Sequence, residues 1–306
     1  MAGAYFTGCA VWAYKDWLGD FYPRGSKAGD FLRLYGDRMT AVEGNTTFYS
    51  MPDAKTIDRW AATMPPGFRF CPKLPRAFSH QGKLVPFVED SHRFLKTLIP
   101  LGAGAASASE NRLGPLFIQL PPTYSPEQVA DLREFLARWP RQQYPIAVEV
   151  RHLDWFAEPF ATRLNQMLTG LGVGRVLLDT RPIYDCIDTC DDDPQIGSER
   201  KKPRVPLQPE VTAPFTIIRY ISHPDLAYNQ PYFDEWVPRL RQWLNAGTDV
   251  YFFAHCPQEA KSPAVARQVY HQLQQAGAAL PALLWDVAEQ KRAEEDTSSA
   301  QLSLFG

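Results

Sequence analysis

The fold class is decided by one strand–helix–strand unit, which reads Leu116-Phe117-Ile118-Gln119-Leu120, then Ser125-Pro126-Glu127-Gln128, then Ile146-Ala147-Val148-Glu149-Val150-Arg151. The two outer runs are apolar at nearly every position, which is typical of parallel strands that are buried on both faces. The middle segment is a capping box with proline at the first helical position, so it predicts the start of a helix. The unit therefore predicts two parallel strands joined by a helical crossover.

The same alternation of apolar runs and helical patterns extends along most of the chain. It predicts an α/β fold, a single-domain TIM-type (β/α)8 barrel over residues 1–290. The segment Arg181–Pro214 has several prolines and no helical period, so we expect a long loop in place of a regular sixth helix. The eight predicted strands are Tyr5–Ala10, Thr40–Asn45, Arg69–Lys73, Leu116–Leu120, Ile146–Arg151, Arg175–Asp179, Thr216–Ile221 and Val250–His255.

The composition is that of an ordinary globular protein. The 306 residues are 45% hydrophobic and 22% charged, with a formal net charge of −2. The protein therefore has no overall positive charge that would attract nucleic acid, and binding to nucleic acid would need a local basic patch. The loop segment 200–204 is the strongest candidate for such a patch. The sequence has no apolar run long enough to span a bilayer and no signal-peptide pattern, and its five cysteines have no regular spacing. These features predict a cytoplasmic protein with reduced thiols and no membrane partner.

Polar residues at the carboxyl ends of the predicted strands converge on one opening in a barrel of this type. A carboxylate inside an apolar strand is costly to bury unless it is paired, ligated or active. The sequence therefore predicts a site for a polar or anionic ligand, and the alternative is a buried ion-pair network that only fixes the strands. The predicted catalytic residues are Glu43, Glu149, Asp179 and His255. The predicted ligand-binding residues are Asn45, Tyr49, Lys73, Arg76, Gln119, Arg151, Trp155 and Arg219.

Several strings in the amino-terminal half are specific enough to indicate a family. They include Gly8…Trp12-Ala13-Tyr14, Val42-Glu43-Gly44-Asn45-Thr46-Thr47-Phe48-Tyr49, Gln119-Leu120-Pro121-Pro122 and Val148-Glu149-Val150-Arg151-His152. On these strings the chain resembles the YecE-like proteins, domain-of-unknown-function family 72. The resemblance implies a TIM-type barrel and no particular activity, because the family has no established one.

The carboxyl-terminal half departs from the family pattern at two strand ends. Arg219-Tyr220-Ile221-Ser222-His223 stands where Arg-x-His-Gly is expected, and Phe252-Phe253-Ala254-His255 stands where paired asparagines are expected. Both ends still carry polar groups. The ligand or the chemistry can therefore differ from that of other members.

A divalent metal is a further hypothesis for the same opening. The architecture is similar to that of barrel enzymes such as metal-dependent isomerases and apurinic endonucleases, and Glu43, Glu149, Asp179 and His255 would be the analogous ligands. Such an oxygen-rich set suits Mg or Mn. The chain has few histidines near strand ends and no metal-binding His spacing, so a metal is not favoured and the cofactor stays unknown.

The last residues form a separate feature. The polar composition of 292–300 predicts a flexible tail over residues 291–306. Its end, Gln301-Leu302-Ser303-Leu304-Phe305, resembles the peptide with which polymerases and repair proteins bind the bacterial sliding clamp. The resemblance implies that Gln301 bonds at the rim of the clamp pocket, with Leu302 in the same peptide, while Leu304 and Phe305 fill an apolar cleft. The alternative is that this end folds back onto the domain.

Three functions remain open from the sequence. The first is a barrel protein recruited to the sliding clamp that acts on or near nucleic acid, by phosphodiester or modified-nucleotide hydrolysis if it is an enzyme. The second is an enzyme acting on a small molecule such as a sugar or sugar phosphate. The third is a non-catalytic, clamp-associated binding module.

Overall fold

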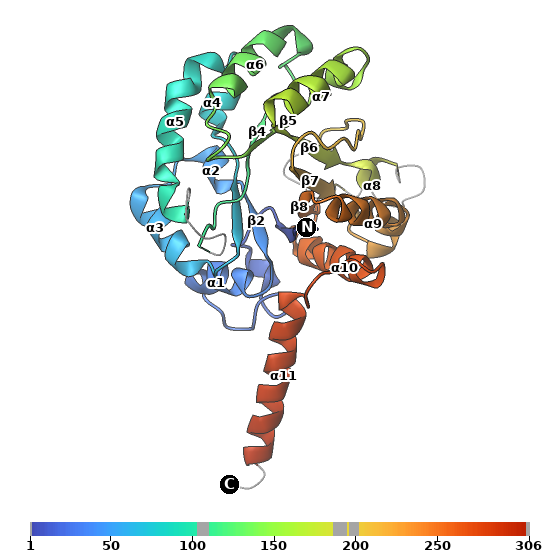
Figure 1. Cartoon of the computed structure of the whole chain (residues 1–306). Coiled ribbons are helices and arrows are strands. Elements are labelled where there is room, and N and C mark those ends of the chain that lie inside the picture. The colour runs from blue at the N-terminus through green and yellow to red at the C-terminus, as the bar shows by residue number, and fades with distance from the viewer. Residues whose placement is uncertain (1, 103–109, 186–194, 196–201, 304–306) are drawn as a thin grey trace.

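The computed structural model describes residues 2–102, 110–185, 195 and 202–303 (Figure 1). All eight predicted strands are present, each within two residues of its predicted bounds. They are β1 (Tyr5–Cys9), β2 (Ala41–Gly44), β3 (Arg69–Pro72), β4 (Leu116–Gln119), β5 (Ile146–Glu149), β6 (Gly174–Asp179), β7 (Phe215–Ile221) and β8 (Asp249–His255). The α/β prediction is confirmed.

Most of the helices surround the strands, as Figure 1 shows. The longer ones among these bury apolar residues that belong to the main hydrophobic core. The α-helices of the described residues are α1 (Phe31–Gly36), α2 (Thr46–Tyr49), α3 (Ala54–Thr63), α4 (Arg76–Ser79), α5 (Val88–Thr97), α6 (Val129–Arg138), α7 (Phe160–Leu171), α8 (Arg181–Tyr184), α9 (Gln230–Asn245), α10 (Ser262–Gln275) and α11 (Leu284–Ser303).

The strands form two parallel sheets. Six of them pair in the order β1-β8-β7-β6-β5-β4, and β2 pairs with β3. Isolated bridges join Phe70 to Leu113 and Lys73 to Phe117, next to the gap between β3 and β4. Between β1 and β2, the amide of Thr40, the residue before β2, donates to the Thr7 carbonyl at 3.1 Å. Neighbouring strands are therefore linked in chain order, although two of these links are not continuous ladders.

A cluster of apolar side chains lies between the strands, and every strand contributes to it. Its members are Phe6, Ala41, Cys71, Phe117, Ala147, Val176, Ile217, Tyr251 and Phe253, with Phe215 packed at the edge. Because side chains alternate between faces along a strand, residues two positions further on point to the same interior. This cluster therefore forms the floor beneath the carboxyl ends of the strands.

Gly8 marks the closest approach between β1 and β2. A Cβ atom on Gly8 would lie 1.8 Å from the Ala41 carbonyl oxygen and 2.6 Å from the Tyr35 hydroxyl. That hydroxyl ties the two strands, since it accepts from the Cys9 amide and donates to the Ala41 carbonyl. Glycine is required here for space between backbones, not for its torsion angles.

The segment after β6 lacks a regular helix in the part that the structure describes. Only α8, a single turn, follows the strand, and residues 202–214 contain neither helix nor strand. Within those described residues the predicted loop is confirmed. The basic residues Arg200 and Lys201 lie outside the described residues, whereas Lys202 and Arg204 lie within them.

The carboxyl-terminal segment contains a long helix. Residues 284–303 form the helix α11, which projects away from the rest of the molecule (Figure 1). Its first turn is anchored, because Trp285 packs on Phe21 and Arg267 pairs with Asp286. Ala, Glu, Gln, Lys and Arg are frequent in this stretch and favour helix. Gln301 and Leu302 lie in its last turn; Leu304 and Phe305 lie outside the described residues.

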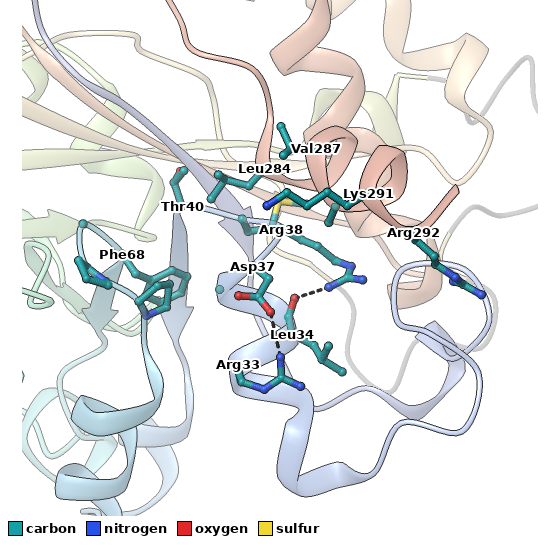
Figure 2. A pocket seen from close by; sticks show the side chains of 16 residues that line it. Arg33, Leu34, Asp37, Arg38, Thr40, Phe68, Leu284, Val287, Lys291 and Arg292 are labelled. Atoms are coloured by element: carbon teal, nitrogen blue, oxygen red, sulfur yellow. Dashed lines mark hydrogen bonds and ion pairs between the residues drawn. The ribbon is translucent and has the colours of Figure 1, made fainter. Parts of the chain in front are cut away.

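The root of α11 forms one wall of a groove of about 830 Å³. Figure 2 shows that α1, the residue Thr40 before β2 and the residue Phe68 before β3 supply the opposite wall. An Arg33–Asp37 ion pair of 3.1 Å lies inside it. The groove is therefore at the amino ends of β2 and β3, away from the carboxyl ends where the predicted site residues lie.

We predict that Gly8→Ala destabilises the fold by about 1–3 kcal/mol or more, because the new methyl group must push β1 from β2. Chemical denaturation of purified protein measures this. Gly29→Ala is the matched control, since a Cβ atom there meets nothing within 4 Å; its change should stay within about 0.5 kcal/mol. Equal effects of the two substitutions would contradict the close approach.

Candidate functional site

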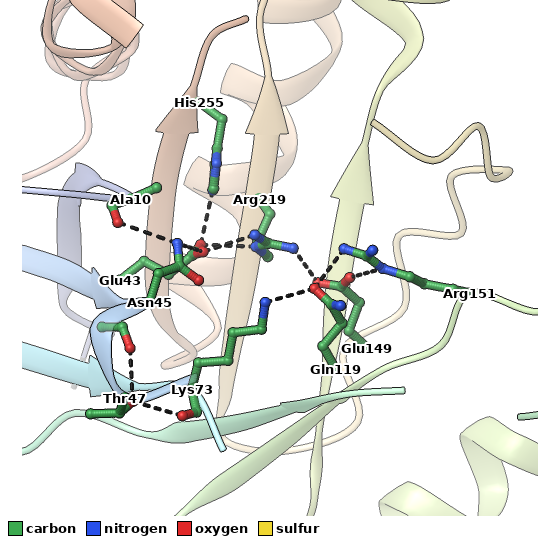
Figure 3. Close-up of polar contacts among 11 residues, drawn as sticks. Ala10, Glu43, Asn45, Thr47, Lys73, Gln119, Glu149, Arg151, Arg219 and His255 are labelled. Atoms are coloured by element: carbon green, nitrogen blue, oxygen red, sulfur yellow. Dashed lines mark hydrogen bonds and ion pairs between the residues drawn. The ribbon is translucent and has the colours of Figure 1, made fainter. Parts of the chain in front are cut away.

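Six polar side chains form a layer directly above the apolar floor, and we call them the polar layer. Each stands two residues after a floor residue on the same strand or its immediate extension, so the pleat directs it to the same interior. Figure 3 shows how they face one another. The polar layer consists of Glu43, Lys73, Gln119, Glu149, Arg219 and His255, and all six are buried.

Arg219 is the centre of the polar layer. Its Nε and Nη2 atoms donate to the two carboxylate oxygens of Glu43, each at 2.8 Å. Its Nη1 atom donates to Glu149 Oε2 at 2.6 Å. The guanidinium therefore holds carboxylates from β2 and β5 at once, in the forked geometry that suits arginine.

The two carboxylates stay ionised although they are buried. Burial alone would raise the pKa of Glu149, but Arg219 and Arg151 outweigh it and lower that pKa to about 2. Burial opposes ionisation of Glu43 as well, and Arg219 and His255 hold its pKa well below the usual range. Neither carboxylate is a proton acceptor near neutral pH in this arrangement.

His255 and Asn45 complete the surroundings of Glu43. The His255 ring nitrogen Nε2 lies 2.9 Å from Glu43 Oε2, and Asn45 Nδ2 donates to Glu43 Oε1 at 2.7 Å. Burial lowers the pKa of His255 to about 4, despite the nearby carboxylate. His255 is therefore neutral at physiological pH and acts as a hydrogen-bond donor.

Lys73 occupies the opposite side of the polar layer. Its ammonium nitrogen lies 2.8 Å from Gln119 Oε1 and 3.8 Å from the centre of the Phe48 ring. Arg151 Nη2 donates to the same oxygen at 2.6 Å, while Arg151 Nε donates to Glu149. Burial, followed by the charge of Arg219, lowers the pKa of Lys73 to about 7. This is the group of the polar layer that exchanges a proton near neutral pH.

The structure does not bring Asp179 together with the other predicted catalytic residues. In the strand register Leu178 is level with Arg219, so Leu178 takes the interior position and Asp179 faces the helices. There Asp179 accepts from Trp236 Nε1 at 2.7 Å and from Arg181 at 2.9 Å. Its carboxylate fixes α9 and the start of the long loop.

Of the predicted ligand-binding residues outside the polar layer, Asn45 and Arg151 bond to its carboxylates, whereas Trp155, Tyr49 and Arg76 have other surroundings. Trp155 is buried and donates to the Tyr124 carbonyl at 2.8 Å, which is a packing role. Tyr49 is 66% exposed, and with the exposed Arg76 it lines a hollow of about 410 Å³ beside Phe48. Asn45, Lys73, Gln119, Arg151 and Arg219 are in contact with one another or with the predicted carboxylates, as expected.

The side chains present do not match the metal hypothesis. It needs Asp179 beside Glu43, Glu149 and His255, and Asp179 faces the helices. Both carboxylates of the polar layer are bound by Arg219. Among the residues that the structure describes, no group of three or more His, Cys, Asp or Glu side chains is placed to hold a metal ion.

Two groups near the polar layer are not among the predicted site residues. Phe48 presents its ring face to Lys73, and its place in the Thr47-Phe48-Tyr49 string was the available signal. Burial raises the pKa of the Glu259 carboxyl to about 7. Glu259 follows β8, and nothing in its sequence surroundings distinguishes it from a surface residue.

Comparison with known proteins assigns the chain to a family. A model described as "Protein of unknown function DUF72" matches residues 6–291. The chain belongs to this family. The protein is 32% identical over 270 residues to UPF0759 protein YecE of Escherichia coli (strain K12), covering 88% of this chain and 92% of that protein. It is 23% identical over 271 residues to UPF0759 protein YunF of Bacillus subtilis (strain 168), covering 80% and 86%.

Solved structures of the DUF72 family share the fold. A protein from Enterococcus faecalis V583 superposes with a TM-score of 0.63 at 18% identity, covering 90% of this chain and 97% of that one. A protein from Thermotoga maritima MSB8 gives a TM-score of 0.60 at 21% identity, covering 89% and 99%. Similarity at this identity supports the fold alone.

We predict that Arg219→Met lowers the free energy of unfolding by about 3–5 kcal/mol, because it leaves buried charge uncompensated. In the present protein the pKa values of both carboxylates lie below the ordinary 4.5, so their stabilisation is present above pH 4.5 and lost towards pH 2. Without Arg219, burial should raise the pKa of Glu43. Stability of the variant should then fall as the pH rises above about 4.5. Denaturation between pH 4 and pH 8 measures both effects.

Arg33→Met is the matched control for Arg219→Met, because the Arg33–Asp37 pair is largely exposed. It should cost at most about 1 kcal/mol and leave the pH dependence unchanged. A wild-type pH profile in Arg219→Met would show that Glu43 is not held by this arginine.

Proposed function

We propose that the polar layer forms part of a binding site for a small molecule carrying a phosphate or carboxylate group. The observation that supports this is an asymmetry in exposure. The side chains of Glu43 and Glu149 are 0% and 1% exposed, whereas that of Arg151 is 19% exposed. The negative charges are buried within the layer, and the more accessible side chain, that of Arg151, is a hydrogen-bond donor.

The charge balance points in the same direction. Glu43 and Glu149 are neutralised by Arg219 and Arg151, so a protonated Lys73 adds uncompensated positive charge. Lys202, within the long loop, is a further basic group close enough for Arg219 and Arg151 to lower its pKa by charge repulsion, in addition to the larger effect of burial. An anionic group bound at this place gains from donors in a low-dielectric setting, where such interactions are strongest.

The depth of the polar layer favours a small ligand. Lys73 and Arg219 retain 5% and 6% of their surface, so a duplex backbone cannot contact them directly. This supports the small-molecule interpretation of the sequence over direct binding of a phosphodiester backbone. A catalytic role for Glu43, Glu149 or His255 remains a prediction, and so does that of Asp179.

We predict that ribose 5-phosphate and pyruvate raise the melting temperature at low salt, whereas uncharged ribose does not. Arg151→Met should reduce the apparent affinity for the anions about tenfold or more, since a charge-assisted hydrogen bond contributes about 1.5–3 kcal/mol. Lys96→Met removes an exposed lysine on α5 and serves as the control. Equal responses to ribose and ribose 5-phosphate, or no loss in Arg151→Met, would contradict an anion site.

A second candidate function follows from α11. The helix leaves the molecule (Figure 1), so its last turn, with Gln301 and Leu302, does not lie on the strands or their helices. This supports recruitment to a bacterial sliding clamp in the cytoplasm through residues 301–305. The ligand in the polar layer would then be a nucleotide or an extruded nucleotide group. The division into a domain over 1–290 and a tail over 291–306 belongs to the same proposal.

We predict that the intact protein binds a purified bacterial sliding clamp with micromolar affinity and that a version ending at Ala300 does not. Surface plasmon resonance measures this directly. The substitution Gln301→Ala should weaken binding, whereas Gln290→Ala, at the root of the same helix, should not. Binding that survives truncation at Ala300 would contradict the role of the peptide.

A further inference from the structure

Lys73 is a buried lysine whose direct hydrogen-bond acceptor is neutral. Its nitrogen lies 2.8 Å from Gln119 Oε1, and no carboxylate forms an ion pair with it among the residues that the structure describes. A buried ammonium group ordinarily has a carboxylate partner. Here an amide stands in that place, and the same amide oxygen also accepts from Arg151.

Charged and titratable groups of both signs surround Lys73. Those that interact with it are the guanidiniums of Arg219 and Arg151, the carboxylates of Glu149 and Glu43, and the His80 ring. Both carboxylates are already bound by a guanidinium, so their attraction is largely compensated. The Phe48 ring favours the ammonium, whereas burial, the largest cause of the lowered pKa of Lys73, opposes it.

We propose that Lys73 is a nucleophile that forms a Schiff base with the carbonyl group of a 2-oxo acid. The proposal rests on the anion site proposed above and names the class of its ligand. A buried amine that is neutral near pH 7 is the form that attacks a carbonyl carbon. The lowered pKa of Lys73 is consistent with this role.

The class of ligand follows from the shared acceptor. Lys73 Nζ and Arg151 Nη2 both donate to Gln119 Oε1, so the amine and the guanidinium lie on either side of one oxygen atom. A 2-oxo acid carries its carboxylate on the carbon next to the carbonyl. Its carboxylate can therefore meet the guanidinium of Arg151, which is the donor suited to a planar anion, while the carbonyl carbon meets the amine.

The reaction requires no further reactant. The lone pair of Nζ forms a bond to the carbonyl carbon, and a proton passes from nitrogen to the former carbonyl oxygen to give a carbinolamine. The C–O bond then breaks and water leaves, taking one proton from solvent because Glu43 and Glu149 stay ionised. The nitrogen gives its remaining proton back to solvent. The products are an imine at Lys73 and one molecule of water.

The test is reductive trapping of the intact protein with pyruvate and cyanoborohydride, followed by peptide mass mapping. We expect one reduced pyruvate adduct on Lys73, formed at a rate that levels off above about pH 7. The exposed Lys96 is the internal control, and it should react slowly. Adduct formation at Lys73 no faster than at Lys96, with the same pH profile, would overturn the proposal.

Two variants sharpen this test. Lys73→Arg keeps the charge but removes the nucleophile, so the fast adduct should disappear. Gln119→Glu places a carboxylate where the amide stands, so it should raise the pKa of Lys73 and slow trapping at pH 7 about tenfold for each unit of that rise. Saturating ribose 5-phosphate should also slow trapping. Anions that bind without any trapping at Lys73 would overturn the Schiff base and leave the anion site standing, whereas absence of both would overturn both.

Discussion

The structure depends on one guanidinium group held between two buried carboxylates. Arg219 on β7 binds Glu43 on β2 and Glu149 on β5, so three strands that are distant in the chain are tied at one height. Buried charges of this kind are tolerated only when their partners are complete. Because Arg219 and Arg151 satisfy the carboxylates, Lys73 has no counter-ion among the described residues, and the reactivity that we propose for it depends on that arrangement.

The strands were predictable because their burial on both faces leaves a nearly continuous apolar run. The same property explains why Asp179 was grouped with the wrong neighbours. A strand that is apolar on both sides shows no alternation, so the sequence does not say which of Leu178 and Asp179 points inward. Only the register against Arg219 decides it. The positions of Glu43, Glu149 and His255 were within reach because each is the last interior residue of its strand.

The hydrogen-bond and ion-pair partners of these side chains were harder to predict from the sequence than their positions on the strands. The sequence identified Lys73 and Gln119 as neighbours at the strand ends, but it gave no sign that a neutral amide would replace a carboxylate beside the lysine. Trp155 was expected at the ligand and instead donates to the Tyr124 carbonyl, because an indole group buried in a core also needs an acceptor. The helix α11 was not foreseen, because the segment was judged by its lack of apolar residues and not by its local helix propensity.

The form of α11 changes what the end of the chain can do. A helix of 20 residues is about 30 Å long and behaves as a stiff spacer, whereas an unfolded segment of equal length samples many distances. Its root lies beside the amino ends of β2 and β3, and the polar layer lies at their carboxyl ends. A protein bound at the end of α11 would thus be held at a defined distance from the strands. It would also be held away from the carboxyl ends of the strands, where we propose that a ligand binds.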